Sequence, residues 1–133
     1  MRSQLILVVD DNQDIRDLIS LILEEEGYSV ISAEEGASAL ALIKEKEPTL
    51  VLLDVMMPGI SGLEVLRQLR ASKRSQVSQT PVIMITAKSQ STDIDEALEL
   101  GATSYIIKPF RADALLEKVQ SFLPIQNQKR GTR

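Results

Sequence analysis

The run Leu5–Val9 (LILVV) lies near the start of the chain and is followed at once by Asp10 and Asp11. The run is apolar at every position and lacks the alternation of apolar and polar residues that marks a strand with one solvent-exposed face. Strands of this kind are buried on both faces, as in a parallel sheet that is covered by helices. The stretch therefore predicts a central strand of an α/β domain with two carboxylates at its carboxyl end.

Similar short runs recur along the chain, and a helix-length segment separates each run from the next. We expect strands at Leu5–Val9, Ser29–Ala33, Leu50–Leu53, Pro81–Ile85 and Ser104–Ile107. The intervening segments carry apolar residues at helical spacing, for example Ile15, Leu18, Ile19 and Ile22. This pattern predicts an α/β fold with a doubly wound, five-stranded parallel sheet of order 2-1-3-4-5, which is flavodoxin-like, (βα)5, with helices on both faces.

Local signals mark the ends of several expected helices. Asp11, with Asp14 three residues later, resembles a capping box at the start of the first helix. Gly27 and Gly101 are placed as left-handed residues that end helices, and Pro124 prevents the last helix from continuing. These signals agree with the helices that the apolar spacing predicts.

The composition excludes several kinds of chemistry. The chain has 133 residues, of which 44% are hydrophobic and 26% charged, and its net charge is -4, as expected for one folded domain. It contains no cysteine and no histidine, which rules out thiolate and imidazole catalysis and metals bound by sulfur or imidazole nitrogen. A metal bound by this chain must have oxygen ligands, which suit Mg²⁺, Ca²⁺ or Mn²⁺.

The organisation of the chain follows from its polar stretches. Residues 1–124 are expected to form one domain, and residues 125–133 a flexible C-terminal tail or a truncated linker. The stretches 59–62 and 72–79 are typical of a turn and of a solvated loop, respectively.

We expect a cytoplasmic protein without membrane association, because no apolar run approaches the roughly 20 residues of a spanning helix and no signal peptide precedes the first strand. The acidic net charge argues against direct nucleic-acid binding.

Polar side chains stand at the carboxyl ends of four of the five expected strands. Asp10 and Asp11 follow the first strand, Asp54 the third, Thr86 the fourth and Lys108 the fifth. Ligands of such sheets bind at this edge, where the strand order reverses between the first and third strands. Crowded carboxylates repel one another, so cations are needed among them, namely the lysine and a divalent metal such as Mg²⁺. A carboxylate nucleophile, a metal, a hydroxyl and a lysine are the groups that phosphoryl transfer needs.

Four motifs occur in order along the chain, VVDDN at Val8–Asn12, LDVMMPG at Leu53–Gly59, ITA at Ile85–Ala87 and YIIKPF at Tyr105–Phe110. With these motifs the chain resembles the response regulator receiver domains of two-component signalling from about residue 5 to residue 123. The resemblance implies a domain that accepts a phosphoryl group from a sensor histidine kinase or a histidine phosphotransfer protein and then changes a protein-binding face. Such a domain is not an enzyme with external turnover, because its chemistry is phosphorylation and dephosphorylation of itself.

The resemblance implies a role for each acidic residue of the site. Asp54 matches the phosphoacceptor. Asp10 and Asp11 match the residues that bind Mg²⁺, directly or through water, together with Asp54 and the backbone carbonyl of Met56. Mn²⁺ is an alternative metal.

The resemblance also implies how phosphorylation is sensed. Thr86 matches the residue whose hydroxyl donates to a phosphoryl oxygen, and Lys108 the residue that pairs with another. The peptide bond before Pro109 is expected to be cis, which would aim Lys108 into the site. Tyr105 matches the switch aromatic, which turns inward as Thr86 moves toward the phosphate. The face that changes, formed by the fourth helix, fifth strand and fifth helix of the βα repeat, is expected to bind a downstream protein target.

Other functions are weighed against this hypothesis. A phosphatase or phosphotransferase with an aspartate nucleophile and a small metabolite substrate is disfavoured, because phosphatases of the haloacid dehalogenase type carry a second Asp where this chain has Met56. A flavin or nucleotide carrier would need a glycine-rich phosphate loop after the first strand, which is absent. A degenerate receiver that only docks partners is disfavoured by the complete set of site residues.

Each site residue taken singly also has an ordinary structural interpretation. Asp10 and Asp11 could be helix caps, Thr86 and Tyr105 could be strand residues, and Lys108 could be a surface charge. Only their convergence on one sheet edge favours a site.

Two further positions bear on the rate of dephosphorylation. Met56 and Lys88 lie two residues after Asp54 and Thr86, where members of the receiver family flank the path of the attacking water. Neither side chain is suited to orient water, so we expect a phosphorylated state that lasts for minutes or more. This chain contains no effector domain, so we expect its output to go through protein contact, either as a free-standing receiver or as a piece of a larger regulator cut near Pro124.

Overall fold

The computed structural model describes residues 4–124, so the tail predicted at 125–133 lies outside the described residues. Its centre is a five-stranded parallel sheet of order β2-β1-β3-β4-β5. The strands are β1 Leu5–Val9, β2 Ser29–Ala33, β3 Leu50–Leu53, β4 Val82–Thr86 and β5 Ser104–Ile107. The predicted order is confirmed. Strand β4 begins one residue later than predicted, because Pro81 has no N–H to donate to the sheet.

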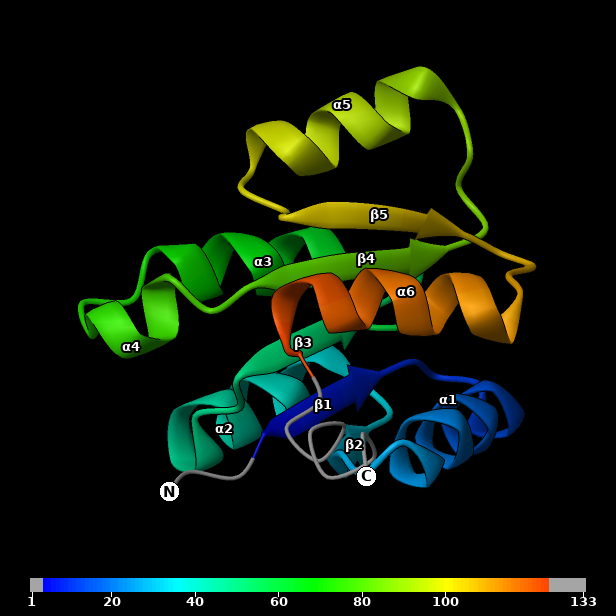
Figure 1. The fold of residues 1–133 in the computed structure, drawn as a ribbon. Coiled ribbons are helices and arrows are strands. Elements are labelled where there is room, and N and C mark those ends of the chain that lie inside the picture. The colour runs from blue at the N-terminus through cyan, green and yellow to red at the C-terminus, as the bar shows by residue number, and fades with distance from the viewer. Residues whose placement is uncertain (1–3, 125–133) are drawn as a thin grey trace.

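Helices cover both faces of the sheet (Figure 1). They are α1 Gln13–Glu25, α2 Gly36–Lys46, α3 Gly62–Arg70, α4 Ser75–Ser78, α5 Ser91–Glu99 and α6 Ala112–Phe122. Buried residues of α1 and α6 share one apolar cluster with the sheet, and buried residues of α2, α3, α4 and α5 share the other. Figure 1 shows α5 lying along β5, at the outer edge of the sheet.

The central strands contribute to both apolar clusters, as the unbroken apolar run of β1 predicts. Ile6 and Val8 pack in the cluster with α1 and α6, whereas Leu7 and Val9 pack in the opposite one. Successive side chains of a strand point to opposite faces, so a strand that is buried on both faces needs apolar residues throughout. Within residues 4–124, no helix combines the length and the apolar character that crossing a membrane requires.

Two local predictions are wrong in an instructive way. The side chain of Asn12, not that of Asp11, caps α1 and accepts a hydrogen bond from the backbone N–H of Ile15 at 3.1 Å. The stretch 72–79 is not a plain loop, because it contains the short helix α4, which buries Val77. The predicted left-handed glycines are confirmed at Gly27 and Gly101, with φ of 101° and 110°.

Arg70, the last residue of α3, ties together several turns at the amino-terminal edge of the sheet. Its guanidinium group donates to the carbonyl oxygens of Gly101 at 2.9 Å, Ser78 at 2.9 Å and Thr80 at 2.6 Å. Burial lowers the pKa of Arg70 from its usual value. This single side chain thereby fixes the turns before β4 and β5, and with them the strands that carry Thr86 and Lys108.

Candidate functional site

Two buried carboxylates meet at the carboxyl edge of the sheet. Asp10 follows β1 and Asp54 follows the neighbouring strand β3, whose residue Leu53 pairs with Val9. The side chains are almost inaccessible, since Asp10 is 2% exposed and Asp54 is 5% exposed. Asp11 is exposed at the rim, and one oxygen from each of the three carboxylates lies within 4.8 Å of the others. The predicted acidic cluster is therefore present.

Lys108 bridges the two buried carboxylates. Its ammonium nitrogen donates to Asp10 Oδ2 at 2.7 Å and to Asp54 Oδ2 at 2.9 Å. The backbone N–H of Lys108 donates to the carbonyl oxygen of Thr86 at 2.9 Å, and the peptide bond to Pro109 is cis, as predicted. The lysine at the end of β5 therefore reaches across to the ends of β1 and β3.

The remaining oxygens of these carboxylates are held by backbone groups. Asp10 Oδ1 accepts from the N–H of Asn12 at 2.9 Å, and Asp54 Oδ1 accepts from the N–H of Met56 at 3.0 Å. Each buried carboxylate is thus fixed at both oxygens, one by the backbone and one by Lys108. This arrangement orients Asp54 before any reaction partner arrives, which favours a reaction at its carboxylate.

The electrostatics of the cluster leave it short of positive charge. Burial raises the pKa of Asp10, although the hydrogen bonds from Lys108 and Asn12 oppose this. Burial lowers the pKa of Lys108, but its hydrogen bonds to Asp10 and Asp54 outweigh that effect and hold the pKa above its usual value. Three carboxylates and one ammonium group leave a formal charge of -2 when all are ionised. An all-oxygen donor set of this charge fits a hard divalent cation such as Mg²⁺.

Thr86 and Tyr105 are connected through the backbone of one residue. Thr86 is fully buried at the end of β4, and its hydroxyl oxygen accepts from the N–H of Lys88 at 3.4 Å. The hydroxyl of half-buried Tyr105 donates to the carbonyl oxygen of Lys88 at 2.9 Å. Burial raises the pKa of Tyr105, with smaller contributions from Asp93 and Asp54. The two residues are thus brought near the acidic cluster, and Lys88 joins them.

Gly62 is a residue beside the site that the sequence does not reveal, because the pattern of residues 59–62 predicts only a turn. Gly62 begins α3, and its N–H donates to the carbonyl oxygen of Val55 at 2.9 Å. A Cβ atom at this position would lie 2.0 Å from the carbonyl oxygen of Asp54. Only glycine lets α3 pack this closely against the backbone that carries Asp54.

The comparison with known families agrees with this geometry. The family model described as the response regulator receiver domain matches residues 6–120. The chain belongs to this family. The receiver domain is 40% identical over 120 residues to the DNA-binding response regulator MtrA of Mycobacterium tuberculosis strain H37Rv, covering 90% of this chain and 50% of that protein. It is 45% identical over 118 residues to the uncharacterised transcriptional regulatory protein YkoG of Bacillus subtilis, covering 89% and 50%. The chain spans about half the length of these curated relatives.

Solved structures show the same fold along their whole length. The chemotaxis protein CheY4 of Vibrio cholerae superposes with a TM-score of 0.85 and 33% identity, covering 92% of this chain and 100% of that one. A CheY-like receiver domain of Methanospirillum hungatei gives 0.84 and 32%, covering 96% and 99%. The BeF3-activated receiver domain of Klebsiella pneumoniae RstA gives 0.81 and 29%, covering 90% and 98%. The receiver is thus a two-component signalling domain with a phosphorylatable aspartate, and the metabolite phosphatase alternative is not favoured.

Proposed function

We propose that this receiver domain accepts a phosphoryl group on Asp54 from the phosphohistidine of a sensor histidine kinase or a histidine phosphotransfer protein, in a Mg²⁺-dependent reaction. The observation that carries the proposal is the position of Asp54, buried to 95% between Lys108 and the N–H of Met56 and beside Asp10 and Asp11. In the transfer, an Asp54 oxygen forms a bond to phosphorus as the bond from phosphorus to the donor's imidazole nitrogen breaks. The product is an aspartyl phosphate.

The residues around Asp54 have complementary roles in this proposal. Asp10, Asp11, Asp54 and the carbonyl oxygen of Met56 would hold Mg²⁺, or Mn²⁺ in its place, and the bound ion would neutralise charge on the phosphoryl oxygens. Once Asp54 carries the phosphoryl group, the ammonium group of Lys108 would pair with a phosphoryl oxygen. It would then lose its present hydrogen bond to Asp54 Oδ2. These are the roles that membership of the receiver family implies, and each is compatible with the charge or hydrogen-bonding capacity of the group named.

Thr86 and Tyr105 would connect phosphorylation of Asp54 to a change at the surface of the domain. If the Thr86 hydroxyl turns to donate to a phosphoryl oxygen, its contact with the N–H of Lys88 is lost, and the carbonyl of Lys88 is the partner of Tyr105. The affected face is formed by α5, β5 and α6, which are the fourth helix, fifth strand and fifth helix of the βα repeat. Leu98 on α5 and Ile107 on β5 are 46% and 41% exposed, which suits a protein-binding surface for the downstream target. The words DNA-binding in the names of relatives apply to those longer proteins.

The test is intact mass spectrometry after incubation with acetyl phosphate and Mg²⁺. We expect one phosphoryl adduct on the wild type and none on Asp54→Asn. Asp14→Asn, which alters an exposed carboxylate on α1, should still form the adduct. An adduct of equal yield on Asp54→Asn would place the acceptor elsewhere. Release of product from many phosphate esters per protein molecule would favour the phosphatase instead.

A further inference from the structure

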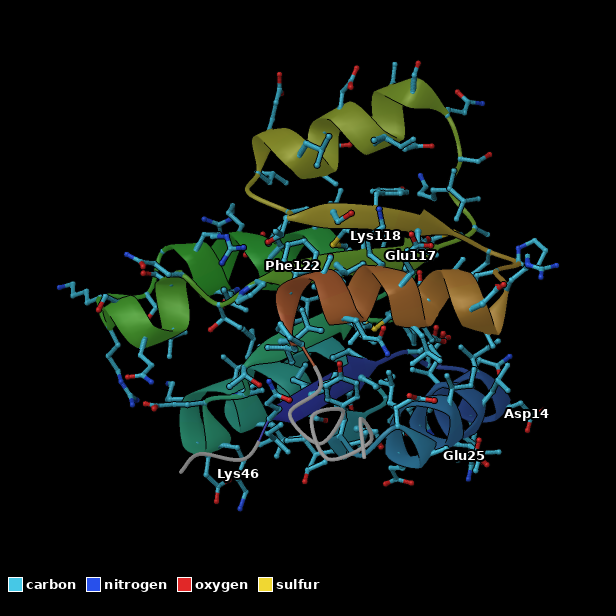
Figure 2. The ribbon with its side chains drawn as sticks, in the orientation of Figure 1. Asp14, Glu25, Lys46, Glu117, Lys118 and Phe122 are labelled. Carbon is cyan, nitrogen blue, oxygen red and sulfur yellow. The ribbon has the colours of Figure 1, made fainter. Side chains whose placement is uncertain are left out.

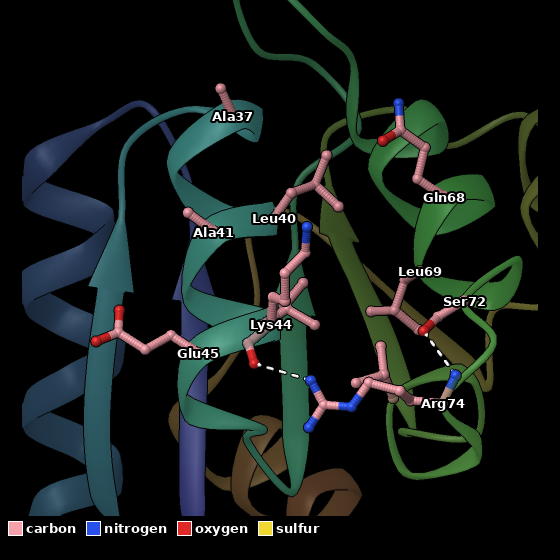
Figure 3. Close-up of a pocket in the computed structure, with 11 residues that line it drawn as sticks. Ala37, Leu40, Ala41, Lys44, Glu45, Gln68, Leu69, Ser72 and Arg74 are labelled. Carbon is pink, nitrogen blue, oxygen red and sulfur yellow. Dashed lines mark hydrogen bonds between the residues drawn. The ribbon is translucent and has the colours of Figure 1, made fainter.

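Two surface hollows differ in their relation to the acidic cluster. A groove of about 740 Å³ lies between α2 and the segment formed by α3 and α4, and none of the acidic site residues line it (Figure 3). A second, open hollow of about 570 Å³ lies at the cluster itself, because its lining includes Asp11 and residues 55–58, which directly follow Asp54. A chemical change in the second hollow therefore acts close to Asp54.

Met56, which lines the second hollow, is the most exposed methionine among residues 4–124. Its exposed fraction is 56%, whereas Met57 is half-buried against the apolar core and Met84 is fully buried in β4. The chain contains no cysteine, histidine or tryptophan, so methionine is its most readily oxidised residue type. Exposed charged side chains, such as Asp14 and Lys46 in Figure 2, offer an oxidant no such group. Oxidation of the folded chain should therefore begin at Met56.

The backbone holds Met56 directly beside the phosphoacceptor. Its N–H donates to Asp54 Oδ1 at 3.0 Å, and its side chain lines the hollow together with Asp11 and Lys88. Asp11 is a proposed Mg²⁺ ligand, the ammonium group of Lys88 only donates, and the thioether of Met56 is a weak acceptor. The hydroxyl oxygen of Ser61, a further lining residue, already accepts a backbone N–H as the N-cap of α3. Water in the hollow thus meets no strong side-chain acceptor that is free.

We propose that Met56 is a site of reversible oxidation by hydrogen peroxide, and that its sulfoxide shortens the lifetime of the aspartyl phosphate. The effect on lifetime rests on the proposed function of Asp54, whereas the oxidation itself does not. In the reaction, a sulfur lone pair attacks one peroxide oxygen as the O–O bond breaks. The sulfur gains this oxygen and gives up two electrons. The departing hydroxide takes the proton of the transferred hydroxyl group and leaves as water.

The sulfoxide supplies the acceptor that the hollow lacks. Oxidation turns an apolar side chain into a polar one without adding a formal charge, so the charge of the acidic cluster is unchanged. The sulfoxide oxygen accepts a hydrogen bond from a water in the hollow, which leaves a lone pair of that water free to attack phosphorus. Methionine sulfoxide reductases restore the thioether, so the change is reversible.

The first test locates the oxidised residue without any phosphodonor. The wild type is treated with hydrogen peroxide for increasing times, catalase removes the peroxide, and peptide mass spectrometry follows the gain of one oxygen atom. Fragmentation of the peptides distinguishes Met56 from its neighbour Met57. We expect Met56 to be oxidised at least about tenfold faster than buried Met84, and also faster than Met57. Oxidation of either of these residues as fast as Met56 would overturn the assignment of the site.

The second test compares the lifetime of the Asp54 adduct in oxidised and untreated protein, in Mg²⁺ and after the phosphodonor is removed. The oxidised wild type should lose the adduct at least about threefold faster than the untreated wild type. Peroxide should not change the lifetime in Met56→Leu, because this variant has no sulfur at that position. Met57→Leu is the matched control one residue along the chain, and it should respond to peroxide as the wild type does. Methionine sulfoxide reductases for both sulfoxide epimers should return the oxidised wild type to its original lifetime.

Three results would overturn the effect on lifetime. They are an unchanged lifetime in wild type that carries the Met56 sulfoxide, failure of that protein to form the adduct, and an equal shortening by peroxide in Met56→Leu. The inference and the proposed function fail in different ways. If untreated wild type forms no adduct, the proposed function is refuted and the effect on lifetime with it, while oxidation of Met56 is still decided by the first test.

Discussion

Asp54 is held by the backbone N–H of Met56 on one oxygen and by Lys108 on the other. The residues of this cluster were predictable from the sequence, because the carboxyl ends of neighbouring parallel strands must meet at one edge. The link between Thr86 and Tyr105 was not, since it runs through the N–H and carbonyl of Lys88. Backbone groups are the same at every residue and leave no signal in a sequence.

We propose that the lifetime of the phosphorylated state depends on Met56 and Lys88, the two residues that flank the path of the attacking water in receiver domains. Met56 is 56% exposed, and its thioether is a weak hydrogen-bond acceptor. The ammonium nitrogen of Lys88 lies 3.7 Å from Asp93 Oδ1, and an ammonium group donates hydrogen bonds but accepts none from an attacking water. We predict a phosphorylated state that lasts on the order of minutes in Mg²⁺. Met56→Asn, whose amide can hold a water, should shorten it by about three- to tenfold.

This lifetime is measured by the loss of the phosphoryl adduct in mass spectra after the phosphodonor is removed. Gln13→Asn, a change at an exposed position of α1, is the control and should leave the lifetime unchanged. Decay of the wild-type adduct within seconds would show that water is oriented by some other group.

Gly62 gives a second prediction at the level of one residue. The methyl group in Gly62→Ala would collide with the carbonyl oxygen of Asp54, so α3 or the Asp54 backbone must move. We expect the free energy of unfolding to fall by about 2–4 kcal/mol, as for other changes that strain a packed backbone. Adduct formation with acetyl phosphate should also slow. Urea unfolding and mass spectrometry measure the two effects.

The matched control is Gly59→Ala. Gly59 has a φ of +78°, but a Cβ atom there would meet nothing within 4 Å. Its cost should therefore be near 1 kcal/mol, from backbone strain alone. The proposed close contact at Gly62 is refuted if both variants lose the same stability and phosphorylate at the same rate.

Secondary structure elements differ in how well the sequence reveals them. The central strands β1, β3 and β4 were predictable because each is an apolar run between polar segments, and burial on both faces requires such runs. The edge strands β2 and β5 contain serine and are partly exposed, and their spacing between helix-length segments indicated them. Helix α4 was not, because Val77 is the only apolar residue in the polar stretch 72–79. Its burial depends on α2 and α3, which lie on either side of the same groove. Contacts between elements of this kind are absent from local sequence.

The end of α6 is tied to the start of β2 by a side chain, which makes its stability sensitive to alkaline pH. The hydroxyl of Tyr28 donates to the carbonyl oxygen of Leu123. Burial, and secondarily Glu26, raises the pKa of Tyr28 from 10.0 to about 12. Because the folded state favours the neutral phenol, its contribution is complete below pH 10 and is lost as the pH rises through about 12.

Tyr28→Phe removes both the hydrogen bond and the titrating group. We expect its free energy of unfolding to be about 1 kcal/mol below that of the wild type at pH 8. Between pH 10 and 12, wild-type stability should fall more steeply, so the two curves converge. Urea unfolding over this range measures the difference, and Tyr105→Phe separates the contribution of the other tyrosine. Parallel curves for wild type and Tyr28→Phe would contradict the assignment.

The acidic cluster lies at the carboxyl edge of the sheet, and the face formed by α5, β5 and α6, which we propose binds a downstream target, lies on the β5 side. The folded chain must hold the cluster's formal charge of -2 against repulsion in order to keep Asp54 ready. Repulsion among the carboxylates lowers the free energy of unfolding, and a bound cation would reduce this repulsion. Metal binding and folding should therefore be coupled.

We therefore predict that Mg²⁺ stabilises the receiver without any phosphodonor. A ligand that binds only the folded state raises the free energy of unfolding by about 1.4 kcal/mol at ten times its Kd. Urea unfolding in MgCl₂, compared with NaCl of equal ionic strength, measures this gain. Asp11→Asn should reduce it, because the variant removes one rim carboxylate and leaves buried Asp10 and Asp54 in place. Asp14→Asn should keep the full gain. An equal gain in NaCl, or an unchanged gain in Asp11→Asn, would show that no cation binds at this cluster, independently of whether Asp54 accepts a phosphoryl group.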